Sequence, residues 1–300
     1  MFGKWFSDER MMNIIDKTPL LLSKQRNNYL KTDVAVIIDE KAYKYFGIPE
    51  AKMCRAIDEN MRNLSHVGFT FHNYLLSDIK KDNFPADDYK LYIFVECVNP
   101  SEEDKAAINK KLKNGGKTLM WLHSASYYDS SLSGFKLEMA DTDVTEVADY
   151  NGNKYCDIYN EPASGVYEDG AYSLPGFKFA DSDGYVISRF SKSREPAVIW
   201  RNMDGYNSVF SLTLVPSVML YKHIANLAGV HLYNRTGDCV YAGGEFAALH
   251  AVSDGYKRIC LPESGYRATN ALTGEPITVN ATFVDIKMKK HETIIIHVEK

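Results

Sequence analysis

The feature that most constrains the fold is a strand–helix–strand pattern in residues 91–124. Residues 91–95 (LYIFV) form a short apolar run, which is typical of a strand buried on both faces. A helix should follow, because Ser101 can cap it, Asp104 completes a capping box and two consecutive glycines end it. A second buried strand is expected at residues 118–122 (TLMWL). Two buried strands joined by a helix predict parallel pairing with a right-handed crossover.

The same alternation begins upstream of this unit. Residues 33–39 (DVAVIID) read as a first strand, residues 49–66 as a helix and residues 69–76 as a second strand. This order predicts a flavodoxin-like, doubly wound parallel sheet of the α/β class. Downstream, the pattern predicts two last strands at residues 197–200 and 208–214 and a closing helix at residues 216–228.

The pattern divides the chain into three parts. Residues 1–30 are predicted to be helical with an interruption at Pro19. Their apolar side chains need a surface to cover, as the tail of a preceding domain would. Residues 31–229 form the α/β domain, with a β-rich insertion at 125–194 that is rich in Tyr, Ser, Asp and Gly. Residues 230–300 carry six short strand patterns separated by turns, which predicts a small β-sandwich.

Composition excludes several classes of function. The formal net charge is −4 and the isoelectric point is near 6.1, and the basic residues are scattered, so no nucleic-acid partner is expected. No apolar run approaches the roughly 18 to 20 residues of a membrane span. The chain as given should be cytoplasmic, or periplasmic or secreted if a longer parent carries a signal peptide. The five cysteines are widely spaced and the eight histidines lack ligand spacing, so no disulfide framework, metal or cofactor is expected.

Three strings carry a resemblance to a known family. They are residues 33–39, the helix start at 101–103 (SEE) with the turn at 115–118 (GGKT), and residues 228–233 (AGVHLY). Together they resemble the C-terminal part of β-galactosidases of glycoside hydrolase family 42 and their relatives. The resemblance covers roughly residues 31–300.

The resemblance implies a specific domain arrangement. In these enzymes a catalytic (β/α)8 barrel is followed by a glutamine-amidotransferase-like α/β domain, often used for trimerisation, and then by a small β-sandwich. This chain has no room for a barrel of about 250 residues. The resemblance therefore implies a homo-oligomer, a trimer, and a catalytic barrel domain that would belong to a longer parent.

The resemblance also locates the position where a nucleophile would lie. Amidotransferases of this fold place a cysteine on a tight turn flanked by glycines, because the strained elbow excludes larger neighbours. The equivalent residues here, 122–126 (LHSAS), contain neither cysteine nor glycine. Cys97, at the end of the preceding strand, and Ser124 with His123 are the catalytic candidates. The alternative for Cys97 is a buried structural thiol. The alternative for Ser124 and His123 is that they are neighbours only in the sequence, because a catalytic pair must be adjacent in space.

Carboxylates and aromatic residues suggest a pocket. Asp39, Asp78 and Glu96 lie at or near the ends of predicted strands, at the edge where open α/β sheets bind ligands. Tyr127 and Tyr128 follow the fourth strand, and flat aromatic faces are typical of carbohydrate-binding surfaces. The alternative is that the acids are solvated or cap helices and that the tyrosines pack a loop against the sheet.

Two hypotheses of function result. The first is a non-catalytic accessory and oligomerisation region of a β-galactosidase-like glycoside hydrolase, acting in carbohydrate metabolism with a carbohydrate as ligand. The alternative is a small hydrolase or amidotransferase-like enzyme that uses the C-terminal edge of the sheet. The absence of a cysteine and glycines at the elbow favours the first hypothesis.

Overall fold

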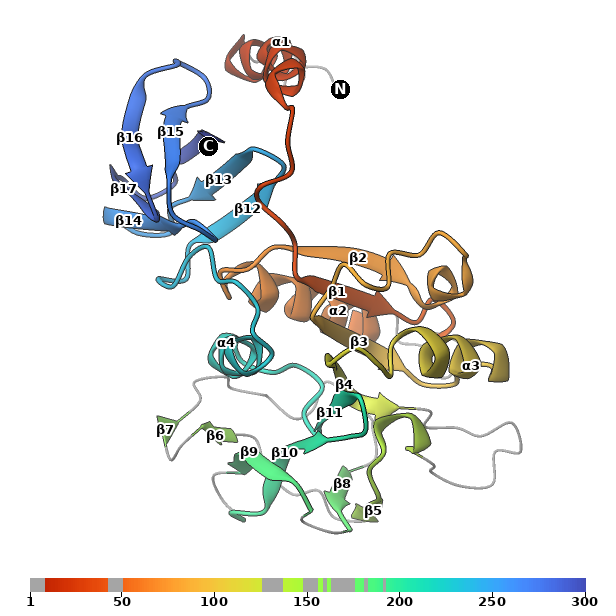
Figure 1. The fold of residues 1–300 in the computed structure, drawn as a ribbon. Helices are drawn as coiled ribbons and strands as arrows, with labels where there is room; N and C mark the ends of the chain where they lie inside the picture. The colour runs from red at the N-terminus through yellow and green to blue at the C-terminus, as the bar shows by residue number, and fades with distance from the viewer. Residues whose placement is uncertain are drawn as a thin grey trace, which may run out of the picture. The chain divides into compact units, whose positions relative to one another are not determined.

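The computed structural model describes residues 9–42, 51–125, 137–147, 156–158, 161–162, 176–180, 183–190 and 193–300. The chain forms two compact units (Figure 1). One unit is Asp33–His231, and the other combines Met1–Thr32 with Leu232–Lys300. The first unit is therefore an insertion between the two segments that make up the second.

The Asp33–His231 unit is built on a nine-stranded mixed sheet. Its parallel part has the order β2-β1-β3-β4-β11, so the chain goes from β1 to one side and then returns to the other side of β1 at β3. The strand order thus reverses between β1 and β3. The five strands are β1 (Val34–Ile38), β2 (Phe71–Leu75), β3 (Leu91–Cys97), β4 (Lys117–Ala125) and β11 (Tyr206–Ser211).

Antiparallel strands extend the sheet beyond β11. β10 (Pro196–Asn202) pairs with β11 and with β9 (Tyr185–Phe190). The short strands β6 (Cys156–Ile158) and β7 (Glu161–Pro162) complete it, and β5 (Val144–Val147) pairs with β8 (Gly176–Phe179) separately. The predicted β-rich insertion thus supplies β5 to β9.

Three helices of this unit occupy predicted positions. They are α2 (Ala51–Ser65), α3 (Glu102–Lys111) and α4 (Val218–Leu227), and there are 3₁₀ turns at Leu76–Lys80 and Glu138–Ala140. The capping box at α3 is confirmed, because the Ser101 Oγ accepts the Asp104 N–H at 3.2 Å and the Asp104 carboxylate accepts the Ser101 N–H at 3.0 Å. No helix in the described ranges has the length and apolar character needed to cross a membrane.

The core of this unit lies around β3 and β4. Every residue of both strands is buried, as the apolar runs predict. Trp121 of β4 stacks on Phe94 of β3, with ring centroids 4.0 Å apart and planes at 13°. Burying a large apolar side chain in this way contributes roughly 2–3 kcal/mol, which fixes the register of the two strands whose ends carry the candidate site.

In its described residues, the second unit contains only antiparallel strands. A five-stranded sheet has the order β12-β13-β18-β15-β16, and β14 pairs with β17. Six of the strands match predicted positions, whereas β16 was missed by the sequence analysis, because it begins with proline and has few buried side chains. The strands are β12 (Cys239–Gly243), β13 (Phe246–His250), β14 (Gly255–Cys260), β15 (Tyr266–Asn270), β16 (Pro276–Ala281), β17 (Phe283–Met288) and β18 (Thr293–Glu299).

The N-terminal segment belongs to this second unit. Its helix α1 (Glu9–Lys24) contains Pro19, so the helix continues through the proline where an interruption was predicted. After the helix, the N–H groups of Tyr29 and Leu30 both donate to the Gly244 carbonyl at 2.9 Å. Leu30 is fully buried in the core of this unit.

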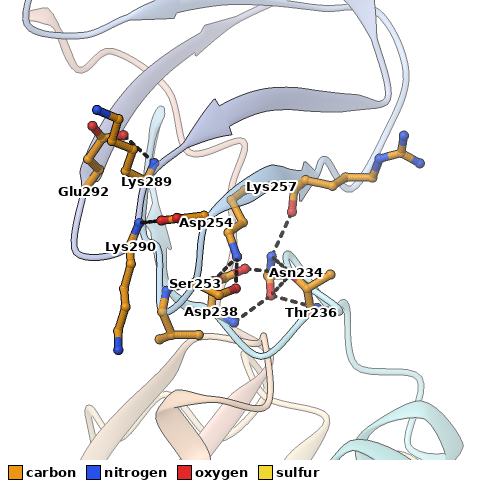
Figure 2. Close-up of polar contacts among 11 residues, drawn as sticks. Asn234, Thr236, Asp238, Ser253, Asp254, Lys257, Lys289, Lys290 and Glu292 are labelled. Carbon is orange, nitrogen blue, oxygen red and sulfur yellow. Dashed lines mark hydrogen bonds and ion pairs between the residues drawn. The ribbon is translucent and has the colours of Figure 1, made fainter.

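A buried polar network stabilises the start of residues 232–300, the C-terminal part of the second unit (Figure 2). The Asp238 carboxylate is fully buried and accepts hydrogen bonds from Lys257 Nζ at 2.9 Å, Thr236 Oγ1 at 2.7 Å and the Val252 N–H at 3.0 Å. Burial raises the pKa of Asp238, but these hydrogen bonds outweigh burial and hold the pKa below its usual value. The Asn234 side chain accepts the N–H groups of Thr236 and Asp238. Since these groups satisfy one another, the network has a structural role.

Candidate functional site

The candidate site lies where the strand order of the parallel sheet reverses. β1, β3 and β4 are neighbours, and their parallel pairing brings their C-terminal ends to one edge. Asp39 follows β1, and Glu96 and His123 lie near the ends of β3 and β4. All three side chains are buried, with exposed fractions of 4%, 2% and 8%. A reversal of strand order at this edge is where open α/β sheets bind ligands.

The backbone at this edge departs from regular strand geometry. The pairing of β3 with β4 shifts between Val95 and Cys97, where β4 supplies one more residue than β3. Glu96 and His123, at this bulge, have φ values of 57° and 59°. This left-handed region costs a residue other than glycine about 1 kcal/mol or more. Such strain and such bulges are concentrated at binding and catalytic sites.

Asp39 is held by the backbone of two neighbouring loops. Its Oδ1 accepts the Lys41 N–H at 2.9 Å and its Oδ2 accepts the Val98 N–H at 3.2 Å. Burial raises the pKa of Asp39, the backbone hydrogen bonds oppose that effect, and the charge of Glu40 adds to it, so the pKa lies above its usual value. Oδ2 therefore ties the end of β1 to the end of β3, and Oδ1 fixes the loop that follows β1.

Glu96 and Glu40 complete a carboxyl cluster with Asp39. Burial and the charge of Asp39 raise the pKa of Glu96 to about 8, so its carboxyl is protonated at neutral pH. Within the described part of the chain, Oε2 of Glu96 and Oε2 of Glu40 are buried atoms without a hydrogen-bond partner. We refer to Asp39, Glu40 and Glu96 as the carboxyl cluster.

The three catalytic candidates lie at the same edge. Cys97 is 1% exposed, and Ser124 and His123 are buried in β4. The Ser124 hydroxyl approaches the Leu122 carbonyl of its own strand at 3.5 Å. The structure thus places these candidates at the same edge as the carboxyl cluster. Residues 122–125 of the predicted elbow lie within strand β4, and Ser126 lies outside the described residues.

The other predicted pocket residues are placed differently. Asp78 lies in the 3₁₀ turn after β2, where it accepts the Leu75 N–H at 2.9 Å and pairs with Lys81 Nζ at 2.7 Å. The hydrogen bonds from Lys81 and from the Leu75 backbone lower the pKa of Asp78. Tyr127 and Tyr128 lie outside the described residues.

The sequence analysis missed two properties of this site. Glu40 was not among the predicted pocket residues, although its Oε2 is buried without a hydrogen-bond partner in the described part of the chain and its charge acts on Asp39. The left-handed conformations of Glu96 and His123 have no local signal, because glycine and asparagine are the usual markers of positive φ. Among the described residues, no group of three His, Cys, Asp or Glu side chains is arranged to hold a metal ion.

Comparisons with known proteins identify the fold. No family model and no curated protein matches the chain. The β-galactosidase from Bacillus circulans sp. alkalophilus is a structural match with a TM-score of 0.67 and 10% identity, covering 96% of this chain and 44% of that one. Gan42B, a GH42 β-galactosidase, matches with a TM-score of 0.61 and 14% identity over 90% of this chain and 40% of that one.

A third match has a different enzymatic name. The α-L-fucosidase isoenzyme 2 from Paenibacillus thiaminolyticus has a TM-score of 0.57 and 11% identity, covering 96% of this chain and 51% of that one. The chain therefore spans about 40 to 51% of the length of these matched structures. At such identities the likeness shows the fold, and the resemblance to β-galactosidases is confirmed at that level.

Proposed function

We propose that this chain is the non-catalytic accessory and oligomerisation region of a β-galactosidase-like glycoside hydrolase. In this proposal residues 31–229 are a flavodoxin-like, glutamine-amidotransferase-like domain, residues 230–300 are a β-sandwich, and residues 1–30 are a helical segment ahead of them. The observation that carries the proposal is coverage: 90 to 96% of this chain matches 40 to 44% of two β-galactosidases. A catalytic barrel in a longer parent would account for the rest of such an enzyme.

The carboxyl chemistry at the sheet edge favours a non-catalytic role. Glycosidases need a carboxylic acid and a second, free carboxylate on either side of the bond that is cleaved. Both oxygens of Asp39 accept backbone hydrogen bonds. Glu96, with a pKa of about 8, retains its proton at neutral pH and is a poor nucleophile or base. We therefore assign Asp39, Asp78 and Glu96, with Tyr127 and Tyr128, to lining a carbohydrate pocket rather than to bond cleavage.

Two measurements on the purified chain test the proposal. Light scattering should give a mass of three times the 34.0 kDa of the monomer, as expected for a trimer. Aryl galactosides, simple esters and simple amides should show no turnover above a buffer control. A monomer at micromolar concentration would contradict the oligomerisation role, and turnover would contradict the non-catalytic role.

The alternative is a small hydrolase or amidotransferase-like enzyme. The observation that favours it is the strained bulge at the ends of β3 and β4, where Glu96 and His123, the sequence neighbours of Cys97 and Ser124, have positive φ values. If the same substrates are turned over, the replacements Ser124→Ala and Cys97→Ala should identify the nucleophile. Loss of turnover in one of the two variants, with an unchanged circular dichroism spectrum, would establish the alternative.

A further inference from the structure

Strands β14 and β17 of the second unit pair to form a two-stranded ribbon (Figure 1). The inner face of the ribbon is apolar, because Ile259, Val284 and Met288 are buried in the core of this unit. Its outer face carries two exposed aromatic side chains, Tyr256 with an exposed fraction of 75% and Phe283 with one of 42%. An antiparallel strand with one face on the core usually presents polar side chains to water, whereas aromatic side chains are enriched at binding surfaces. The outer face is therefore a candidate binding surface.

A rigid ion pair lies on the outer face, between the positions of the two rings. Arg258 lies opposite Asp285, and its Nε and Nη2 donate to Oδ1 and Oδ2 of Asp285 at 2.7 and 2.6 Å. The guanidinium group also lies over the Phe283 ring, 3.9 Å from the ring centroid. Two parallel hydrogen bonds and a cation–π contact hold a side chain that would otherwise sample many rotamers. A ligand of this pair would therefore lose little affinity to the ordering of side chains.

We propose that this outer face, formed by Tyr256, Arg258, Phe283 and Asp285, binds an extended, neutral oligosaccharide. A sugar ring has an apolar face of C–H groups that packs on an aromatic ring, and a rim of hydroxyl groups that donate and accept hydrogen bonds. The ribbon offers both chemistries side by side, because the exposed ring of Tyr256 is followed two residues later by the ion pair of Arg258. The inference deepens the proposed function and rests on it for the choice of a sugar as the ligand.

The ion pair retains hydrogen-bonding capacity for a ligand. A guanidinium group has five N–H donors, and Asp285 occupies two of those of Arg258. The two side chains are 52% and 38% exposed, so a ligand in solution can reach them. The hydrogen bond from Arg258 holds the pKa of Asp285 below its usual value, so the carboxylate is an ionised acceptor at neutral pH. Neighbouring hydroxyl groups of a sugar can therefore accept from the guanidinium group and donate to the carboxylate.

The dimensions of this face fit a short sugar chain better than a protein. Phe283 lies opposite Cys260, four residues along β14 from Tyr256, which corresponds to about 13 Å. The two strands of six residues cover about 20 Å by 10 Å, or roughly 200 Å². A stable protein interface buries about 800 Å² on each partner, and the ion pair interrupts the apolar surface of this face. An oligosaccharide of a few units is therefore the better fit.

Titration calorimetry on the full chain at pH 7 tests the inference. The probes are β-1,4-galactotetraose, cellotetraose and galactose. Galactotetraose should bind more tightly than galactose, because only the longer sugar extends along the whole face. Tyr256→Ala should weaken this binding by roughly three- to tenfold, and Arg258→Lys, which keeps the charge but loses the paired hydrogen bonds, should also weaken it. The matched control is Tyr241→Ala, which removes a tyrosine of 67% exposure from β12 in the other sheet of this unit, and it should leave the affinity unchanged.

Three results would overturn the inference: binding of neither tetrasaccharide, an equal loss of affinity in Tyr256→Ala and Tyr241→Ala, or a change of oligomeric mass in Tyr256→Ala. The last result would identify the ribbon as an interface between copies of the chain. Binding of cellotetraose alone, weakened in Tyr256→Ala, would support the site and contradict the link to a β-galactosidase-like enzyme. The mass and turnover of the parent chain test the proposed function separately, so a monomeric chain that binds a tetrasaccharide through Tyr256 would remove the accessory role and keep the site.

Discussion

Replacing Glu96 with glutamine should change how the stability of the Asp33–His231 unit depends on pH. The carboxyl of Glu96 is 2% exposed, and burial together with the charge of Asp39 raises its pKa from 4.5 to about 8. Each pKa unit between the folded and unfolded states corresponds to about 1.4 kcal/mol. The difference for Glu96 is therefore roughly 5 kcal/mol of unfolding free energy once both states are ionised.

The direction follows from proton binding. Between pH 4.5 and about 8 the folded state keeps the Glu96 proton while the unfolded state has released it, so the free energy of unfolding falls as the pH rises. The stability associated with the neutral carboxyl is fully present below pH 4.5 and is lost progressively up to about pH 8. Glutamine has no proton to lose. The variant should therefore gain stability relative to the parent protein as the pH rises, by up to roughly 5 kcal/mol.

Urea unfolding at pH 5.0 and at pH 8.5 measures this difference. Tryptophan fluorescence follows this unfolding, because two of the three tryptophans, Trp121 beside Phe94 in β4 and Trp200 in β10, belong to this unit. The difference in free energy of unfolding between the Glu96→Gln variant and the parent protein should be several kcal/mol larger at about pH 8.5 than at about pH 5.0. The control variant Glu275→Gln makes the same charge change on an exposed residue of the other unit, and it should show no such increase. An equal gap at the two pH values would refute the assignment of a protonated, buried Glu96.

Three further substitutions test structural contacts by chemical denaturation. Lys257→Met leaves the buried carboxylate of Asp238 without its cation and should lower the free energy of unfolding by about 3–5 kcal/mol. The double variant with Asp238→Asn should be more stable than the single variant, and the reverse order would contradict a buried ion pair. Leu30→Ala should lower the free energy of unfolding of the second unit by about 2–5 kcal/mol, and an effect confined to the Asp33–His231 unit would contradict the observed packing. Ser101→Ala removes the cap of α3 and should cost about 1 kcal/mol, and no loss would mean that Asp104 alone satisfies the helix start.

The parts of the fold that follow from local rules could be predicted from the sequence. The capping box at Ser101 and Asp104 needs only two side chains three residues apart, and it forms as predicted. The apolar runs of β3 and β4 predict burial on both faces, and every residue of both strands is buried. Parallel pairing follows because the helix between them leaves little alternative. These features depend on residues close together in the chain.

The parts of the site that depend on distant residues could not be predicted in this way. Glu96 and His123 adopt left-handed conformations because two strands meet with unequal numbers of residues, and neither residue type marks such a conformation. The sequence analysis brings Asp39 and Glu96 to one edge, but it cannot show that backbone N–H groups occupy the first while the second lacks a partner for Oε2. The chemistry of the two acids therefore differs for reasons that lie in the loops around them.

The N-terminal segment shows the same limit at the level of the whole chain. Arg26 and Asn27 hydrogen-bond to the buried carboxylate of Glu245, which lies 219 and 218 residues away in the sequence. No local pattern can report a contact of that separation, and a helical segment ahead of a strand was therefore read as a part of its own. Because this contact belongs to the second unit, the chain must leave that unit and return to it.

The two ends of the inserted unit lie side by side, as an insertion requires. The His231 N–H donates to Asp33 Oδ2 at 2.9 Å, and Lys90 Nζ donates both to Asp33 Oδ2 and to the Gly229 carbonyl at 3.0 Å. Domains whose ends are close together tolerate insertion into another domain. Glu96 belongs to this inserted unit, so it can be substituted without altering the contacts that hold the N-terminal segment within the second unit.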